Sequence, residues 1–165
     1  MIGESFMVRY ATREELERVN ELRKIVNKVH CNGRPDIFRG GFCKELQEYV
    51  YTLWENDNSD VIVAIRDGEI YGFACVDYVE KAESPYNLAR RFYHINEFGV
   101  DTKYRRQGVA TELFDFIKKE ATDKNFDKIE LDMWEFNDVA LKFYESVGFV
   151  TYRRFMEFTN LDVKN

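Results

Sequence analysis

The residues best suited to chemistry lie between positions 100 and 111. Residues 100–110 read VDTKYRRQGVA and join the end of an expected strand to a glycine that opens a long amphipathic helix. The first turn of a helix leaves backbone N–H groups without an acceptor and carries the positive end of the helix dipole. Gly108 has no Cβ to keep a ligand away, and Arg105 and Arg106 add positive charge. This turn therefore suits an anionic diphosphate.

The elements that must position this turn follow from the hydrophobic pattern. Asp67-Gly68 favours the positive φ angles of a tight hairpin turn, and Thr12 with Glu15 forms a capping box. The expected order is β-α-α-β-β-β-α-β-α-β, a mixed α/β sheet in a single domain over residues 1–165, with a parallel pair across the helix that follows the turn. We expect strands at 5–11, 61–66, 69–77, 92–100, 128–134 and 149–158, and helices at 12–30, 42–55, 108–125 and 137–147.

Composition and charge exclude other classes of protein. The 165 residues fit one domain, and a hydrophobic fraction of 45% excludes a disordered chain. The 30 acidic and 24 basic residues give a formal net charge of −6, whereas a nucleic-acid-binding domain usually shows a basic excess. We therefore expect no nucleic-acid partner.

The sequence also bears on location and on metals. No run of ~18 apolar residues is present, so we expect no membrane partner, and residues 1–10 lack the pattern of a secretory signal. The three cysteines contain no CxxC pair, which predicts neither a disulfide framework nor a metal site. A cytoplasmic protein is expected.

Two motifs give this chain a family resemblance. Residues 105–110, RRQGVA, match the signature Q/R-x-x-G-x-G/A of the Gcn5-related N-acetyltransferases, the GNAT superfamily. Residues 137–149, NDVALKFYESVGF, resemble the second motif of that family, N-x-x-A-x-x-x-Y-x-x-x-G-F. The expected order of elements is also that of the family, so the resemblance extends over about the whole chain.

The resemblance implies acetyl-CoA as the cofactor. Its pyrophosphate would bind the loop and helix start, and its pantetheine arm would pair with the strand before the loop. A bulge near residues 97–99 would splay this fourth strand from the fifth, which starts at Lys128, and so open a V. The cofactor-binding residues implied are Phe98, Gly99, Val100, Arg105, Arg106, Gln107, Gly108, Val109, Ala110, Thr111, Asn137 and Tyr144.

Acyl transfer to an amine needs a base, an oxyanion donor and an acid. An amine is protonated near neutral pH and must lose a proton before it attacks a thioester. The resemblance places Tyr144 near the departing sulfur as the acid, and the backbone amide of Phe98 is the expected oxyanion donor. Glu97 is the first candidate base and His94 the second. The alternation of a strand puts these two on opposite faces unless the bulge intervenes.

Acidic side chains near the acceptor end favour a cationic amine. The loop at 32–42 is a candidate lid, as in relatives, and the expected acceptor-binding residues are Asn96, Asp132, Glu135, Asp36 and Phe38. A small molecule with a primary amine is the expected acceptor. A protein N-terminus or lysine is one alternative, and a non-catalytic acyl-CoA-binding sensor is another. Dimers are common in the family, so a homodimer is compatible with the resemblance.

Overall fold

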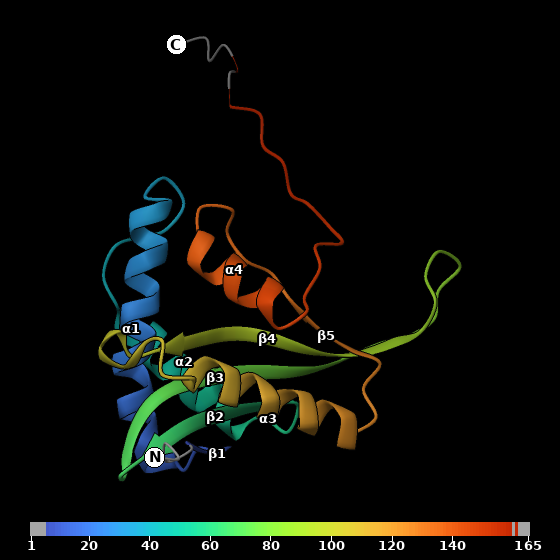
Figure 1. Ribbon diagram of the computed structural model, residues 1–165. Helices are drawn as coiled ribbons and strands as arrows, with labels where there is room; N and C mark the ends of the chain where they lie inside the picture. Colours follow the sequence, from blue (N-terminus) through green and yellow to red (C-terminus); the bar gives the residue numbers. More distant parts are fainter. Residues whose placement is uncertain (1–5, 160, 162–165) are drawn as a thin grey trace. The chain divides into compact units, whose positions relative to one another are not determined.

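The chain folds into two compact units, and the boundary between them in the sequence follows Asp132. The computed structural model describes residues 6–159 and 161 (Figure 1). The first unit contains a sheet and three α-helices, and the second, from Met133, contains one α-helix.

A mixed five-stranded sheet forms the centre of the first unit. Its strands are ordered β1-β2-β3-β4-β5, and every neighbouring pair is antiparallel except β4 and β5, which are parallel. The parallel pair confirms the crossover that the sequence predicts through the helix after the turn. The bounds are Met7–Tyr10 for β1, Ser59–Arg66 for β2, Glu69–Lys81 for β3, Arg90–Val100 for β4 and Lys128–Leu131 for β5.

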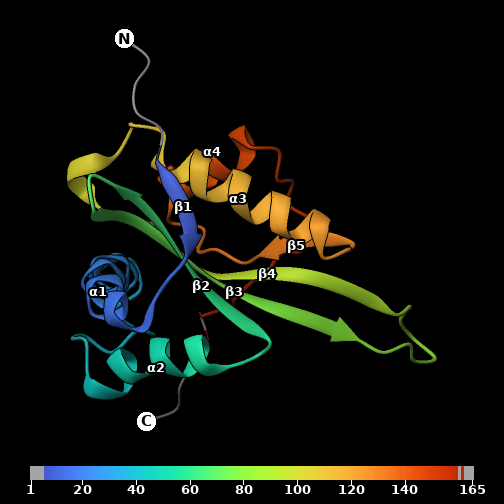
Figure 2. The same cartoon turned by 90° about the horizontal axis from the view of Figure 1, so that it is seen from below.

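Helices cover both faces of this sheet. α1 (Leu16–Gly33) and α2 (Lys44–Glu55) lie on one face, and α3 (Val109–Asp123) lies on the other (Figure 2). A short 3-10 turn precedes α1, where the backbone N–H of Thr12 donates to the Glu15 carboxylate at 2.8 Å, as the capping box predicts. The second unit contains α4 (Asp138–Ser146).

The strands are apolar on both faces because both are covered. Val61, Val63, Phe73 and Cys75 are fully buried in a cluster with side chains of α1 and α2. The residues that alternate with them, such as Ile62 and Ala74, are also fully buried, and α3 packs on that other face. This double burial explains the continuous apolar runs in β2 and β3.

The predicted hairpin between β2 and β3 is confirmed. Asp67 and Gly68 have φ angles of 53° and 78°, which a two-residue turn between twisted strands requires. β3 and β4 then run further than the sequence predicts, to Lys81 and from Arg90, and their far ends project from the first unit (Figure 2). The antiparallel pairing of β3 with β4 runs from Gly72 opposite Val100 to Lys81 opposite Arg90.

The sixth strand, expected at 149–158, does not form. In the described part of this segment no residue pairs as a strand, and the side chains of Val150, Phe155 and Met156 are 82%, 82% and 93% exposed. Its alternating pattern is local, whereas a strand also needs a neighbouring edge to which its backbone groups can bond. The strand expected at 128–134 also ends early, at Leu131.

No helix within residues 6–159 and 161 combines the length and the apolar character needed to cross a membrane.

Candidate active site

The turn before α3 has a backbone conformation that most residues avoid. Arg106 and Gly108 both lie in the left-handed region, with φ of 61° and 86°. A Cβ built on Gly108 would meet no atom within 4 Å, so the glycine is required by its φ angle and borders open space. The carboxylate of Asp101 fixes the start of the turn, because it accepts from the backbone N–H of Lys103 at 3.0 Å and pairs with Arg18 at 2.7 Å.

The first turn of α3 packs closely against the sheet at Gly72. A Cβ on Gly72 would lie 2.8 Å from Val109 Cγ1 and 3.0 Å from Leu113 Cδ1. The glycine therefore lets the helix start approach β3 closely. Because the first amides of an α-helix have no acceptor within it, the N–H groups that follow Gly108 are oriented out of the helix start. Their position is set by this contact.

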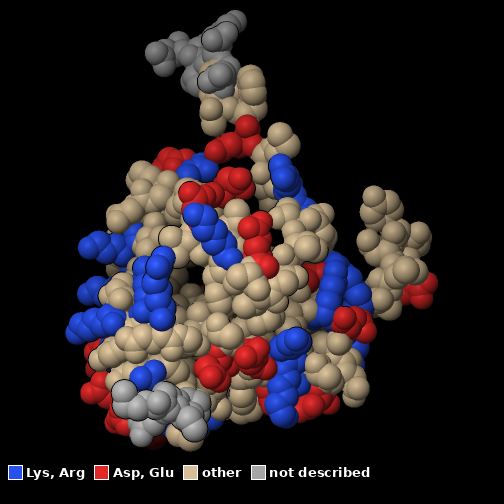
Figure 3. Space-filling model, in the orientation of Figure 1, with Lys and Arg blue, Asp and Glu red and all other residues tan. Residues whose placement is uncertain are grey.

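Positive charge surrounds the same turn. Lys103, Arg105 and Arg106 are exposed. Lys and Arg side chains gather along the edge of the first unit that carries α1 and this turn (Figure 3). The residues present thus fit a diphosphate, since a left-handed glycine, a helix start and three basic side chains occur together.

β4 separates from β5 just before the turn. Their pairing covers only Phe92–Ile95 of β4, opposite Lys128–Leu131, while β4 continues to Val100. This ending produces the V that the sequence predicts between the fourth and fifth strands. Phe98, Gly99 and Val100 lie on β4 beyond the point of separation.

A bulge lies where the strands separate. Ile95 is opposite Val76 and Glu97 is opposite Cys75, so Asn96 is an extra residue on β4. The bulge is thus one residue earlier than the predicted 97–99. His94 is opposite Asp77, and Glu97 is opposite Cys75. Because the side chains of Cys75 and Asp77 point to the same face of β3, the bulge puts Glu97 and His94 on one face of the sheet. The Nδ2 atom of Asn96 is buried and has no hydrogen-bond partner among the described residues.

Glu97 is held by an arginine that sequence reasoning missed. Arg23 of α1 donates from Nε and Nη2 to the two carboxylate oxygens of Glu97, at 2.6 and 2.9 Å. The Arg23 side chain is only 3% exposed and that of Glu97 25%. Both oxygens of the first candidate base are therefore occupied by a bidentate ion pair with a buried arginine. The two residues are 74 positions apart, and no local pattern links them.

The second candidate base has a looser environment. His94 Nε2 lies 3.5 Å from Asp132 Oδ1, and the Asp132 side chain is 85% exposed. The structure thus brings together three of the predicted residues, His94, Asn96 and Glu97, with Asp132 beside His94.

The loop between α1 and α2 has its own contacts. Asp36 pairs with Arg34 at 2.7 Å, which lowers the pKa of its carboxyl group. Phe38 stacks on the ring of His30 at 5.3 Å between centroids. Burial lowers the pKa of His30, and the carboxylate of Glu97 opposes this shift. His30 and the loop therefore lie on the side of the sheet where Glu97 is, although the sequence did not single out His30 as a site residue.

In the second unit, the end of α4 fixes Tyr144. Gly148, with φ of 102°, donates its N–H to Glu145 O at 3.1 Å, and Phe149 donates to Tyr144 O at 2.9 Å. This is the Schellman arrangement, and the rings of Tyr144 and Phe149 pack at 5.5 Å as its usual apolar contact. The G-F pair of the motif therefore orients the tyrosine. Burial raises the pKa of Tyr144 to about 12.

The other predicted residues of this unit lie at the start of α4. Asn137 is the N-cap, and its side chain accepts from the backbone N–H of Ala140 at 3.2 Å. Its amide nitrogen can still donate elsewhere. Glu135 is exposed in the turn that precedes this cap.

Comparison with known proteins gives the class. The model of the acetyltransferase (GNAT) family matches residues 30–149. Human and mouse N-alpha-acetyltransferase 30 are each 33% identical to the chain over 129 residues, which are 75% of this chain and 34% of theirs. The chain thus spans about a third of the length of these relatives. It belongs to the acetyltransferase (GNAT) family.

Solved structures agree with this fold. A mutant of the BH1408 protein from Bacillus halodurans has a TM-score of 0.90 and 28% identity, over 94% of this chain and 99% of that one. The aminoglycoside acetyltransferase AAC(6')-Iy, in complex with a CoA bisubstrate analogue, has a TM-score of 0.72 and 19% identity, over 96% of this chain and 99% of that one. The second likeness is one of fold alone.

Proposed function

We propose that this protein transfers an acetyl group from acetyl-CoA to the primary amine of a small cationic molecule. The observation that carries the proposal is the left-handed Gly108 turn at the start of α3, directly after the strand that leaves β5. These features suit a long, anionic cofactor: the turn for its diphosphate, and the β4 backbone at Phe98–Val100 for its amide-containing arm.

Each step of the reaction has a residue to serve it. Acetyl-CoA, when bound, supplies a thioester whose carbonyl carbon the amine attacks as the C–S bond breaks. His94 accepts the proton that the amine loses, directly or through water. The backbone N–H of Phe98 donates to the carbonyl oxygen as it gains negative charge. Tyr144 returns a proton to the departing sulfur, which suits a hydroxyl whose pKa of about 12 keeps it protonated at neutral pH.

Two observations favour His94 over Glu97 as the base. Arg23 occupies both oxygens of Glu97, so proton transfer to that carboxylate would require the ion pair to open. His94 lies one residue before the β4–β5 pairing ends, and the carboxylate near its Nε2, that of Asp132, is exposed. We therefore assign proton acceptance to His94.

The acceptor side is acidic and aromatic. Asp132 and Asn96 lie beside His94, and Phe38 and Asp36 belong to the loop on the Glu97 side. Carboxylates and ring faces together attract a protonated amine.

A protein N-terminus is the second candidate acceptor. The 33% identity to N-alpha-acetyltransferase 30 favours it, because this likeness exceeds the 19% identity to AAC(6')-Iy. An assay with both kinds of amine separates the two.

The test is release of free CoA thiol from acetyl-CoA over a panel of amines. The panel contains spermidine, an aminoglycoside, free amino acids and peptides with an unblocked N-terminus. We expect release with a small polycation and little with peptides; the reverse order would establish the second candidate. Tight acetyl-CoA binding with no release for any amine would instead indicate a non-catalytic sensor.

A further inference from the structure

We propose that Arg23 and Glu97 form a clamp that holds the β4 bulge in the position acyl transfer needs. In this view both are positioning residues, and Glu97 is not the proton acceptor. The inference rests on the proposed function, because the bulge matters only if β4 lies beside the acyl group.

The guanidinium of Arg23 joins three elements. Besides its two bonds to Glu97 on β4, its Nη1 donates to Leu46 O of α2 at 2.5 Å and to Asn20 Oδ1 of α1 at 2.8 Å. The rings of Phe42 and Tyr49 lie 5.5 and 5.6 Å from its Cζ atom. Four of its five N–H donors thus have acceptors. A buried charge with this many partners fixes geometry rather than responding to solvent.

The clamp acts at the one irregular point of β4. Asn96 interrupts the β3–β4 ladder, and Glu97 is the first residue paired again after it. A bulge leaves its extra residue outside the ladder, so the ladder alone does not hold it. The bond from Glu97 to α1 supplies the missing restraint. Phe98, the expected oxyanion donor, is the next residue along the strand.

A clamp and a base respond differently to substitution. Removal of Arg23 leaves the Glu97 carboxylate without its cation, whereas removal of both charges leaves neither uncompensated. Neutralising both should therefore repair part of the damage done by removing Arg23 alone. A lost base is not repaired by a second substitution, because no group then takes the proton.

The experiment compares Arg23→Met, Glu97→Gln and the double variant. Two readouts are used: kcat with the best amine of the panel at saturating acetyl-CoA, and hydrogen exchange of the amides at 96–98. We expect Arg23→Met to lower kcat by about 30-fold or more and to speed exchange, and the double variant to regain about fivefold, the mark of coupled residues. Glu97→Gln should keep about a tenth or more of kcat, because its amide oxygen still accepts one bond from Arg23. Its pH profile should match that of the wild type.

The Arg9–Glu15 pair supplies a matched control. Arg9 also binds a glutamate through two bonds, at 2.9 and 2.7 Å, but it joins β1 to the turn before α1. Arg9→Met should change neither kcat nor exchange at 96–98. If Arg23→Met does not fold, Arg23→Lys replaces it, because lysine keeps the charge but not the two-pronged contact.

One pattern of results would show that the clamp is wrong. In that pattern Glu97→Gln lowers kcat about a thousandfold and removes the acidic limb of the pH profile, while Arg23→Met leaves exchange unchanged. A loss of that size is typical of a general base. Unchanged exchange in all three variants would also overturn it. The exchange measurement needs no turnover, so a protein that acetylates none of the amines still tests the clamp separately from the proposed function.

Discussion

At the scale of single residues, Tyr144 is the group whose surroundings best match its proposed task. Its ring packs against Phe143 and Phe149, and the Schellman end of α4 sets its position. We expect Tyr144→Phe to lower kcat by about 10- to 100-fold with little effect on acetyl-CoA affinity, because only the hydroxyl is lost. Steady-state kinetics and calorimetry measure the two quantities. Wild-type kcat in this variant would remove Tyr144 from the mechanism.

The pH dependence of kcat gives a second check on Tyr144. With a pKa of about 12, its hydroxyl keeps its proton through pH 10 and loses it only well above. Its donor function should therefore be constant up to pH 10 and decline beyond. A decline centred near pH 8 that disappears in Tyr144→Phe would contradict this assignment.

His94 is tested by acceptors of different basicity. His94→Asn should lower kcat/KM by about 10²- to 10⁴-fold for an amine that is protonated at the assay pH. For a weakly basic amine, which is already neutral, the loss should be much smaller because no proton has to be removed before attack. Equal losses for both amines would indicate that His94 positions the acceptor instead.

At the scale of elements, local chemistry could be predicted and contacts across the fold could not. The Asp67-Gly68 turn and the opening of α3 at Gly108 depend on neighbouring residues, and both form where the sequence places them. The bulge at Asn96 depends on the pairing of β4 with β3, and the Glu97 ion pair depends on Arg23, which reaches Glu97 only through packing. The sequence therefore predicted the position of the turn before α3 but not the contacts of Glu97.

The close packing of α3 against β3 at Gly72 predicts that a larger residue there lowers the stability of the fold. Gly72→Ala would place a methyl group 2.8 Å from Val109 Cγ1, so either the Val109 side chain or the start of α3 must shift. We expect a loss of about 1–3 kcal/mol in the free energy of unfolding and weaker acetyl-CoA binding. Gly40→Ala is the control, because a Cβ there meets nothing within 4 Å. Equal stability of the two variants in urea would show that α3 does not need this close approach.

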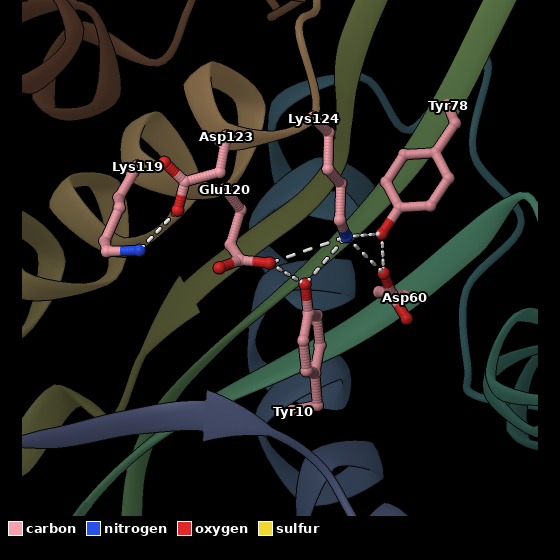
Figure 4. A network of polar contacts seen from close by, with 7 residues as sticks. All are labelled: Tyr10, Asp60, Tyr78, Lys119, Glu120, Asp123 and Lys124. Atoms are coloured by element: carbon pink, nitrogen blue, oxygen red, sulfur yellow. Dashed lines mark hydrogen bonds and ion pairs between the residues drawn. The ribbon is translucent and has the colours of Figure 1, made fainter.

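The other end of α3 is fixed by a polar network (Figure 4). Lys124 Nζ donates to the hydroxyls of Tyr10 and Tyr78 at 2.8 and 2.6 Å. The tyrosines in turn donate to Glu120 and Asp60, respectively. The network thus joins the end of α3 to β1, β2 and β3.

This network predicts a loss of stability in alkali. Burial, and after it the hydrogen bond to Glu120, raises the pKa of Tyr10 to about 12. Burial lowers the pKa of Lys124, but its hydrogen bond to Tyr10 and its nearby carboxylates outweigh burial, so that pKa is raised as well. Both groups favour the protonated form when folded, so their contribution is complete below their ordinary pKa values and is lost as pH rises through the raised ones. The melting temperature should fall between pH 10 and about 12. Tyr10→Phe should cost about 1 kcal/mol at pH 7 and reduce the alkaline decline, because it removes a titrating hydroxyl and an acceptor that raises the pKa of Lys124; an undiminished decline would exclude the network as its cause.

At the scale of the whole molecule, the net charge of the chain and the charge of the proposed ligand are both negative. The chain carries a formal charge of −6, yet the edge with α1 and the turn before α3 is rich in Lys and Arg (Figure 3). Local charge therefore decides where an anion binds, whereas overall composition does not. Composition could exclude disorder, but only the motifs at 105–110 and 137–149 indicated the chemistry.

The most direct test of the account is calorimetric titration of acetyl-CoA into Gly108→Val and Gly68→Val. Both glycines have a positive φ and open space around a built Cβ, so the two substitutions carry a similar backbone cost, but only Gly108 is in the proposed diphosphate turn. We predict that Gly108→Val weakens binding by about tenfold or more, since it blocks close approach to the helix start. Gly68→Val should leave Kd unchanged. Equal affinities of the two variants would contradict the account.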